Sequence, residues 1–178
     1  MKADPVWVRV RQSLAVRGPA TAAELRPLAG LSQSTFSRLL ARHASEVLTV
    51  GRTRNTRYAL RRDVPGVGLT VPLFSVGEDG GTRRLGTLHG VYPDGFHVAS
   101  ESDSLVERFT VDLPYFLHDL RPSGFLGRLV CGHHPDLALP ADPRLWSTET
   151  TLLYLSRAGS DLPGNLIVGS GALARYVA

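Results

Sequence analysis

The chain has 178 residues, of which 43% are hydrophobic and 20% are charged, and its formal net charge is +4 at pH 7. No apolar run approaches the roughly 20 residues of a membrane-spanning helix, and the first residues lack the apolar centre of a signal peptide. The lone cysteine, Cys131, cannot form an internal disulfide. We therefore expect a cytoplasmic protein with one or two small domains and no contact with a membrane.

The positive charge is concentrated in the first third of the chain. Residues 1–62 carry 12 Lys and Arg against 3 acidic residues, a net charge of +9, whereas residues 63–178 carry 8 against 13, a net charge of −5. Arginine supplies every one of these basic side chains except Lys2. Such an asymmetry is typical of a basic nucleic-acid-binding module joined to a body with a different task.

A first helix is predicted over residues 5–17. Val6, Val10 and Leu14 recur there at helical spacing, and Gly18 with the proline after it ends the pattern. We expect this helix to be the first of a three-helix core.

A pair of short helices joined by a tight glycine turn is predicted next. Thr21 and Glu24 have the spacing of a capping box, so the first helix of the pair should begin directly after Thr21. Leu25 and Leu28 should be buried. Pro27 lies beyond the first turn and removes a backbone donor, so we expect this helix to be short or bent.

The second helix of the pair follows Gly30 and should be capped by Ser32. Its apolar stripe is predicted to consist of Phe36, Leu39, Leu40 and His43. Its candidate DNA contacts are Gln33, Ser34, Thr35, Ser37, Arg38 and Arg42. Side chains of these types reach base edges and phosphates from a recognition helix in the major groove.

A β-hairpin is predicted after this helix, because residues 46–50 and 57–60 alternate around a polar turn. The loop and its end supply the remaining candidate DNA contacts, Arg52, Arg54, Asn55 and Arg57. No acidic residue separates them. Such side chains suit phosphate contacts or insertion into a narrow minor groove.

Residues 30–40 resemble the turn and recognition helix of bacterial helix-turn-helix regulators. Together with the hairpin, the resemblance implies a winged helix-turn-helix over residues 1–62. We predict that this domain binds double-stranded DNA, and a homodimer would fit regulators that read two half-sites.

A second domain is predicted over residues 71–178, after a Pro- and Gly-rich linker at 63–70. Its strands should be 71–76, 82–91, 96–100, 105–110 and 165–168. Helical segments should follow residue 113 with a break at Pro122, then cover 147–158 and 172–177. The expected fold class is α+β, a winged helix-turn-helix followed by a small antiparallel-sheet domain with packed helices.

This second half resembles the N-terminal subdomain of HipA-family serine/threonine kinases, the toxins of bacterial toxin–antitoxin pairs. More closely, it resembles a subgroup whose chains begin with a winged helix-turn-helix. The matching positions are Leu113, Pro114, Asp119, Arg121, Pro122, Gly124–Arg128, Asp161 and Pro163–Leu166. The resemblance implies that the kinase's phosphate loop and catalytic residues lie downstream of such a subdomain.

No kinase chemistry is predicted for this chain itself. Lys2 is the sole lysine, and residues 81–87 have Walker spacing without the lysine that such a loop needs. Asp161 and Asn165 lack the spacing of a catalytic loop and a second metal carboxylate, so we interpret them as a turn that enters a strand.

No cofactor and no metal site is predicted. Cys131, His133 and His134 do not have a zinc spacing, and we expect surface polar residues there. The aromatic residues Tyr115, Phe116, Phe125 and Trp146 fit either a core or a partner-binding surface.

The predicted function is that of a DNA-binding regulatory component of a HipA-type toxin–antitoxin kinase system. Its second domain would dock on a kinase core, in the same chain or in another. One alternative is an N-terminal fragment of a full-length HipA-like kinase. Another is a winged-helix repressor that senses a small ligand, for which a polar pocket in the sheet domain would be the discriminating feature.

Overall fold

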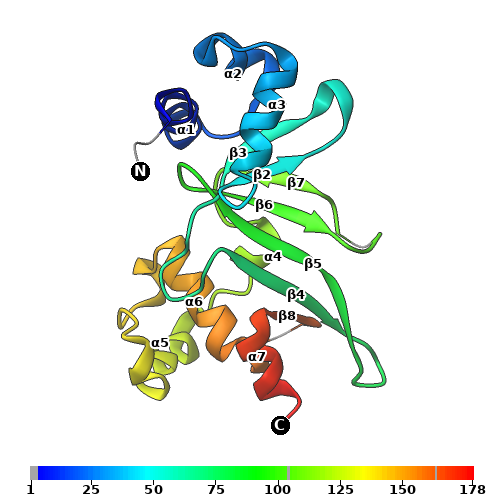
Figure 1. The fold of residues 1–178 in the computed structure, drawn as a ribbon. Coiled ribbons are helices and arrows are strands. Elements are labelled where there is room, and N and C mark those ends of the chain that lie inside the picture. Colours follow the sequence, from blue (N-terminus) through cyan, green and yellow to red (C-terminus); the bar gives the residue numbers. More distant parts are fainter. Residues whose placement is uncertain (1–3, 104, 163) are drawn as a thin grey trace. The chain divides into compact units, whose positions relative to one another are not determined.

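A computed structural model describes residues 4–103, 105–162 and 164–178 (Figure 1). The described chain forms two compact units. Unit 1 comprises the residues up to Arg62 together with Gly90–Gly95, and unit 2 comprises Asp63–His89 and Phe96–Ala178. Both units combine helices with antiparallel strands, so the predicted α+β class is confirmed. None of the described helices is long and apolar enough to cross a membrane.

Unit 1 contains three helices and three short strands. In chain order they are α1 (Pro5–Arg17), β1 (Ala20–Thr21), α2 (Ala22–Ala29), α3 (Gln33–Arg42), β2 (Val47–Val50) and β3 (Arg57–Leu60). A 3-10 turn over Thr53–Asn55 joins β2 to β3. The strands pair antiparallel in the order β1-β3-β2. The helix pair and the hairpin are confirmed, whereas the two-residue strand β1 was not expected.

The predicted helix caps of unit 1 are present. The backbone N–H of Thr21 donates to Glu24 at 2.6 Å, and the N–H of Glu24 donates back to the Thr21 hydroxyl at 3.4 Å. Gly30 ends α2 in the left-handed conformation with φ 65°, and the Ser32 hydroxyl accepts from the N–H of Thr35. The helix with the internal Pro27 is short, at eight residues.

The core of unit 1 differs from the predicted one at Leu28. On α1, Trp7, Val10 and Leu14 are buried, and the partly buried Val6 packs against this core. The prediction for Leu28 is wrong: its side chain is 37% exposed, and Ala29 takes the buried position. The buried residues that form its core cluster are Trp7, Val10, Leu14, Leu25, Ala29, Phe36, Leu39, Leu40, Val47 and Leu60.

His43 lies just beyond α3 and is half-buried rather than part of the apolar stripe. Its ring stacks on Trp7 with centroids 3.9 Å apart, and its Nδ1 lies 3.0 Å from a carboxylate oxygen of Glu46. The imidazole therefore joins the end of α3 to α1.

Unit 2 is a five-stranded sheet with four helices. The strands are β4 (Thr70–Val76), β5 (Thr82–Val91), β6 (Gly95–Ser100), β7 (Arg108–Thr110) and β8 (Leu166–Val168), in the sheet order β7-β6-β5-β4-β8. The helices are α4 (Tyr115–His118), α5 (Gly124–His133), α6 (Thr148–Ala158) and α7 (Gly169–Tyr176). The helical break at Pro122 and the cap at Ser147 are confirmed. β7 is shorter than the predicted 105–110, and α7 begins three residues before the predicted helix.

The core of unit 2 lies between the sheet and its helices. Its strand side chains include Val71, Leu73, Leu88, Phe96 and Val98, and its helix side chains include Leu117, Leu152 and Leu155. Trp146 is also buried there and donates its indole N–H to the carbonyl of Pro140 at 2.8 Å. Of the four aromatic residues singled out in the sequence, Trp146 is thus a core residue.

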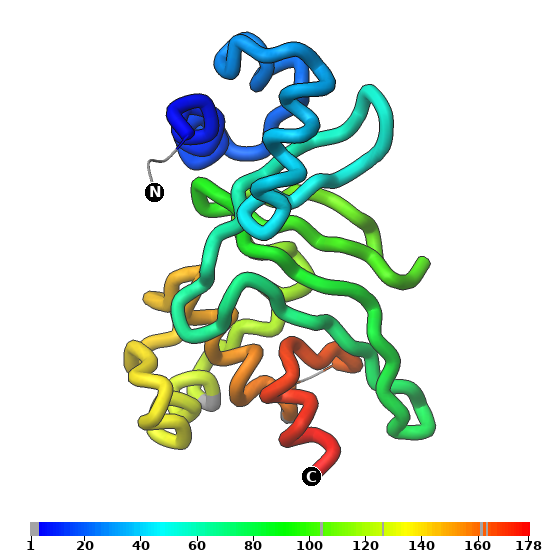
Figure 2. Tube along the Cα trace, viewed as in Figure 1, coloured from blue at the N-terminus to red at the C-terminus, as the bar shows by residue number. Residues whose placement is uncertain are grey.

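Two glycines allow α7 to lie directly against α6 (Figure 2). Gly169 has φ +83°, and a Cβ there would lie 2.9 Å from the Cβ of Ser156. A Cβ on Gly171 would lie 2.9 Å from the Ser156 carbonyl oxygen. No real side chain tolerates these distances, so the close contact of the two helices requires both glycines.

We expect Gly169→Ala to lower the free energy of unfolding by about 2–4 kcal/mol, because it adds left-handed strain to an overpacked contact. The matched control is Gly132→Ala in α5, where an added Cβ meets nothing within 4 Å. That control should raise stability by about 0.5–1 kcal/mol through helix propensity. Urea unfolding of the whole chain measures both. Equal stability of the two variants would contradict the packing interpretation.

Candidate nucleic-acid interface

The outer face of α3 carries the side chains predicted to contact DNA. Gln33, Ser34, Ser37, Arg38 and Arg42 are all exposed. A strong amphipathic pattern explains this, since the opposite face of the helix is fully committed to the core of unit 1.

A shallow hollow of about 590 Å³ lies along the C-terminal part of this face. It is lined by Thr35, Arg38, Ala41 and Arg42. Thr35 is half-buried, and its hydroxyl lies 3.0 Å from that of Ser32. Arg38 folds back, with its Nε 3.4 Å from the carbonyl of Ser34. Two guanidinium groups thus border a concave strip of the helix.

A second groove, of about 540 Å³, opens between the start of α2, the start of α3 and the hairpin. Its lining residues are Thr21, Ala22, Ala23, Arg26, Gln33, Thr53, Arg54, Thr56 and Tyr58. Arg26 was missed from the sequence, although its position one turn before Gly30 directs it toward the start of the next helix. Its Nη1 donates to the Oε1 of Gln33 at 2.9 Å.

The hairpin tip presents its predicted residues to solvent. Arg52, Arg54, Asn55 and Arg57 are exposed, and in the described part of the chain none of the three arginines forms a salt bridge. The tip is held by its own hydrogen bonds. Thr53, at φ 55°, donates its hydroxyl to Arg52, and Thr56 donates its hydroxyl to the carbonyl of Thr53. The arginines are therefore carried on a defined turn.

One carboxylate, that of Glu24, influences the electrostatics beside the groove. The backbone N–H of Thr21, then its hydroxyl, and then the charge of Arg57 lower the Glu24 pKa below its usual 4.5. Glu24 is therefore ionised at neutral pH, and its carboxylate accepts hydrogen bonds from the backbone N–H and the hydroxyl of Thr21 at the start of α2.

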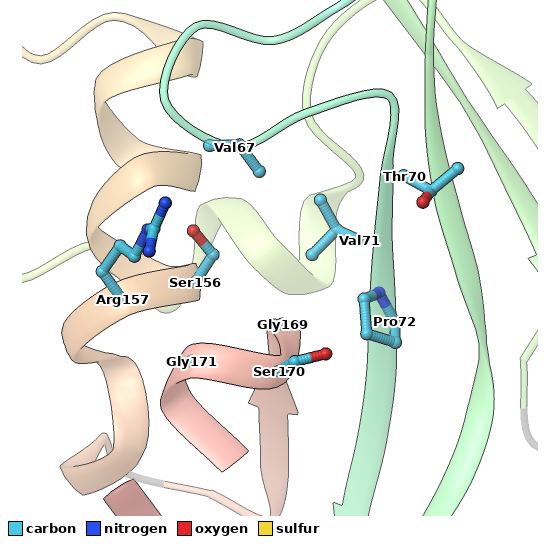
Figure 3. A pocket seen from close by; sticks show the side chains of 9 residues that line it. All are labelled: Val67, Thr70, Val71, Pro72, Ser156, Arg157, Gly169, Ser170 and Gly171. Carbon is cyan, nitrogen blue, oxygen red and sulfur yellow. The ribbon is translucent and has the colours of Figure 1, made fainter. Parts of the chain in front are cut away.

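Unit 2 contains a small pocket of about 210 Å³ (Figure 3). Side chains of β4 stand on one side and those of α6 on the other, with the start of α7 between them. The lining residues are Val67, Thr70, Val71, Pro72, Ser156, Arg157, Gly169, Ser170 and Gly171. Typical small-molecule sites measure about 300–1,000 Å³. This pocket is smaller than that range, so it gives no support of its own to the ligand-sensing alternative.

A larger, more apolar groove of about 380 Å³ lies elsewhere on unit 2. Its lining residues are Leu85, Leu105, Val106, Arg108, Tyr115, Phe116, Leu120, Gly164, Asn165 and Leu166. Val106 is 70% exposed and Tyr115 is 67% exposed, and the guanidinium of Arg108 lies 5.1 Å from the centre of the Tyr115 ring. Phe125 is also exposed, so unit 2 leaves large apolar side chains in water.

The motifs considered for catalysis or metal binding are dispersed. Residues 81–87 form the end of a turn and the start of β5, and Asn165 directly precedes β8. The thiol of Cys131 donates to the carbonyl of Pro140 at 3.0 Å. Among the residues that the structure describes, no three His, Cys, Asp or Glu side chains gather as metal ligands would. Pro163 lies outside the described residues.

Comparison with known proteins gives one matching family model and a similar toxin, but no matching solved structure. Residues 67–177 match the family model described as the YjjJ-like toxin, middle domain. The chain is also similar to the toxin YjjJ of Escherichia coli (strain K12), with 36% identity over 166 residues. This alignment covers 92% of the chain and 37% of the relative's length. No solved structure matches.

These matches correct the resemblance inferred from the sequence. We predicted the N-terminal subdomain of a HipA-family kinase, in a subgroup with a winged helix-turn-helix, and that assignment is wrong. Residues 67–177, which include the positions on which that resemblance was based, match the middle domain of YjjJ-like toxins instead.

We expect Glu24→Gln to destabilise unit 1 most at neutral pH. The lowered pKa means that the carboxylate's contribution is complete above pH 4.5 and is lost as the pH falls through the folded-state pKa. Urea unfolding at pH 7 and pH 3 should show the difference from the original chain shrinking in acid. Thr21→Ala removes only the hydroxyl bonds and keeps the backbone N–H donor to Glu24, so it should retain part of the pH dependence. A difference that stays constant with pH would contradict this account.

Proposed function

The chain belongs to the family of YjjJ-like toxins, and from this premise we propose that it is the DNA-binding regulatory component of a toxin–antitoxin system. Homology to a toxin associates the chain with such systems. The observation that carries the DNA-binding part is the pairing of an exposed polar face on α3 with an arginine-rich hairpin tip.

Unit 1 has the element order of a winged helix-turn-helix. Three helices precede an antiparallel hairpin, and β1 closes the small sheet. In such a domain the second helix of the pair enters the major groove, and the hairpin contacts the backbone or the minor groove. We assign base contacts to Gln33, Ser34 and Ser37 of α3. Phosphate contacts are assigned to Thr35, Arg38, Arg42, Arg52, Arg54, Asn55 and Arg57.

Charge supports this assignment. The first 62 residues have a net charge of +9, and within the described residues the three arginines of the hairpin form no salt bridge. Binding a duplex with such a surface releases condensed counterions, so the affinity should fall steeply as salt is added.

Unit 2 is proposed to dock on a HipA-type kinase core through its apolar groove. Val106 and Tyr115 are large apolar side chains at a groove rim, and Phe125 is exposed on α5. Large apolar side chains exposed at a groove mark interaction sites. The chain spans 37% of the length of the relative it matches, so the toxic activity itself is proposed to reside in a kinase core rather than in these residues.

Arg52→Ala, Arg54→Ala and Arg57→Ala combined should weaken binding to promoter DNA by about 30-fold or more. Each lost phosphate contact should also reduce the salt slope by about 1, because fewer counterions are released. Fluorescence anisotropy with a labelled duplex at several salt concentrations measures both quantities.

The matched control replaces Arg83, Arg128 and Arg175, three exposed arginines of unit 2, by alanine. It changes the net charge equally and should leave affinity and salt slope within about twofold of the original chain. Unchanged binding by the hairpin variant would reject the proposed interface.

The docking part is tested with the whole chain and a HipA-type kinase core encoded beside its gene. Val106→Asp with Tyr115→Asp should abolish co-elution in size-exclusion chromatography, because burying two carboxylates in the interface is costly. The control, Leu145→Asp with Val177→Asp, changes two equally exposed apolar residues outside the groove and should keep the complex. Absence of any complex with the original chain would reject docking.

A further inference from the structure

We propose that Arg26 is a specificity-determining residue that makes the start of α3 select guanine over adenine. The inference rests on the proposed DNA binding and deepens it. Arg26 lies on α2, outside the predicted recognition face, yet it holds the first side chain of α3.

The geometry fixes the orientation of the Gln33 carboxamide. Nη1 of Arg26 lies 2.9 Å from the Oε1 of Gln33. A guanidinium group has only donors, so the carboxamide atom that faces it must be the oxygen. The amide nitrogen of Gln33, with its two donor hydrogens, is then directed away from Arg26.

The Arg26 side chain is anchored rather than free. Its residue is half-buried, and within the described part of the chain its Nε is enclosed without a hydrogen-bond partner. The buried Nε limits the positions that the guanidinium can take. Gln33 is therefore preorganised before DNA arrives, and the pair acts as one unit.

Occupation of the carboxamide oxygen changes which base the unit reads. A free glutamine recognises adenine with both its atoms, accepting from N6 and donating to N7. The bond from Arg26 occupies one of the two lone pairs of Oε1 and brings further guanidinium donors beside the Gln33 amide, so donors outnumber acceptors in the pair. Guanine offers two acceptors, O6 and N7, at its major-groove edge. The donor-rich pair therefore fits guanine better than adenine, because the adenine amino group would have to compete with the guanidinium for Oε1.

The surrounding groove has the same character. Arg54 is the other charged residue among its lining side chains, whereas the hydroxyls of Thr21, Thr53 and Thr56 already donate their protons within the chain. No carboxylate lines the groove in the described structure. A group rich in hydrogen-bond acceptors suits this site. On DNA, such a group is either the major-groove edge of guanine or a phosphate. The contact with Gln33 at the start of α3 favours the base.

The test is selection of duplexes from a randomised library by the purified whole chain. The original chain should prefer guanine at one position. Arg26→Met keeps the length of the side chain but frees the Gln33 oxygen, so the guanine-to-adenine ratio at that position should fall at least about fivefold. Gln33→Ala should make the position indifferent, and the double variant should add no further change. Arg9→Met, on the exposed surface of α1, is the charge-matched control and should keep the preference.

Three results would overturn the inference. One is DNA binding by the original chain without a guanine preference. Another is an Arg26→Met variant that weakens all sequences equally and lowers the salt slope by about 1, which indicates a phosphate contact. The third is a loss of the guanine preference in Arg26→Lys as large as that in Arg26→Met, because the lysine retains a donor for the Gln33 oxygen. If Arg26→Met does not fold, Arg26→Lys is the variant that tests the inference. Failure of the original chain to bind any DNA at low salt would instead reject the proposed function, and this inference with it.

Discussion

The placement of α3 depends on a turn of three residues, and the whole candidate interface depends on α3. Gly30 adopts a left-handed conformation that ends α2, and its N–H donates to the carbonyl of Arg26 at 2.9 Å. Ser32 then caps α3. Arg26 thus contributes twice, since its carbonyl closes the turn while its guanidinium holds Gln33. The direction of the recognition face is set by the same residues that end the preceding helix.

Unit 2 relies on a different constraint, the close approach of two helices. The absence of side chains at Gly169 and Gly171 lets the start of α7 reach the backbone of α6. This contact lies inside the segment that matches the toxin family's middle domain. It also forms one wall of the small pocket.

Much of the fold could be predicted because its signals are local. Helix caps depend only on residues close in the sequence, so they can be predicted from it. The structure contains the predicted caps at Thr21 with Glu24, at Ser32 and at Ser147. Burial is decided by distant neighbours, which is why Leu28 was wrongly expected in the core.

The candidate site shows the same division. The exposed face of α3 and the hairpin arginines follow from periodicity and composition. The hydrogen bond between Arg26 and Gln33 joins residues seven positions apart on either side of a turn. Because the two residues lie on different helices, the helical periodicity of the sequence does not indicate their contact. The family assignment failed for a related reason. Leu113 and Pro114 are buried, so they report the packing of a scaffold, and scaffolds recur among distinct families.

The hairpin tip also bears on how the chain survives in a cell. Exposed arginines on a short turn are the bonds that trypsin-like proteases reach first. A cut after Arg54 would separate β2 from β3 while leaving the three helices and their buried side chains joined. Bound DNA would cover this bond. On the proposed DNA binding, occupancy of the operator and the lifetime of the intact chain would be coupled, because proteolysis would remove the unbound molecules first.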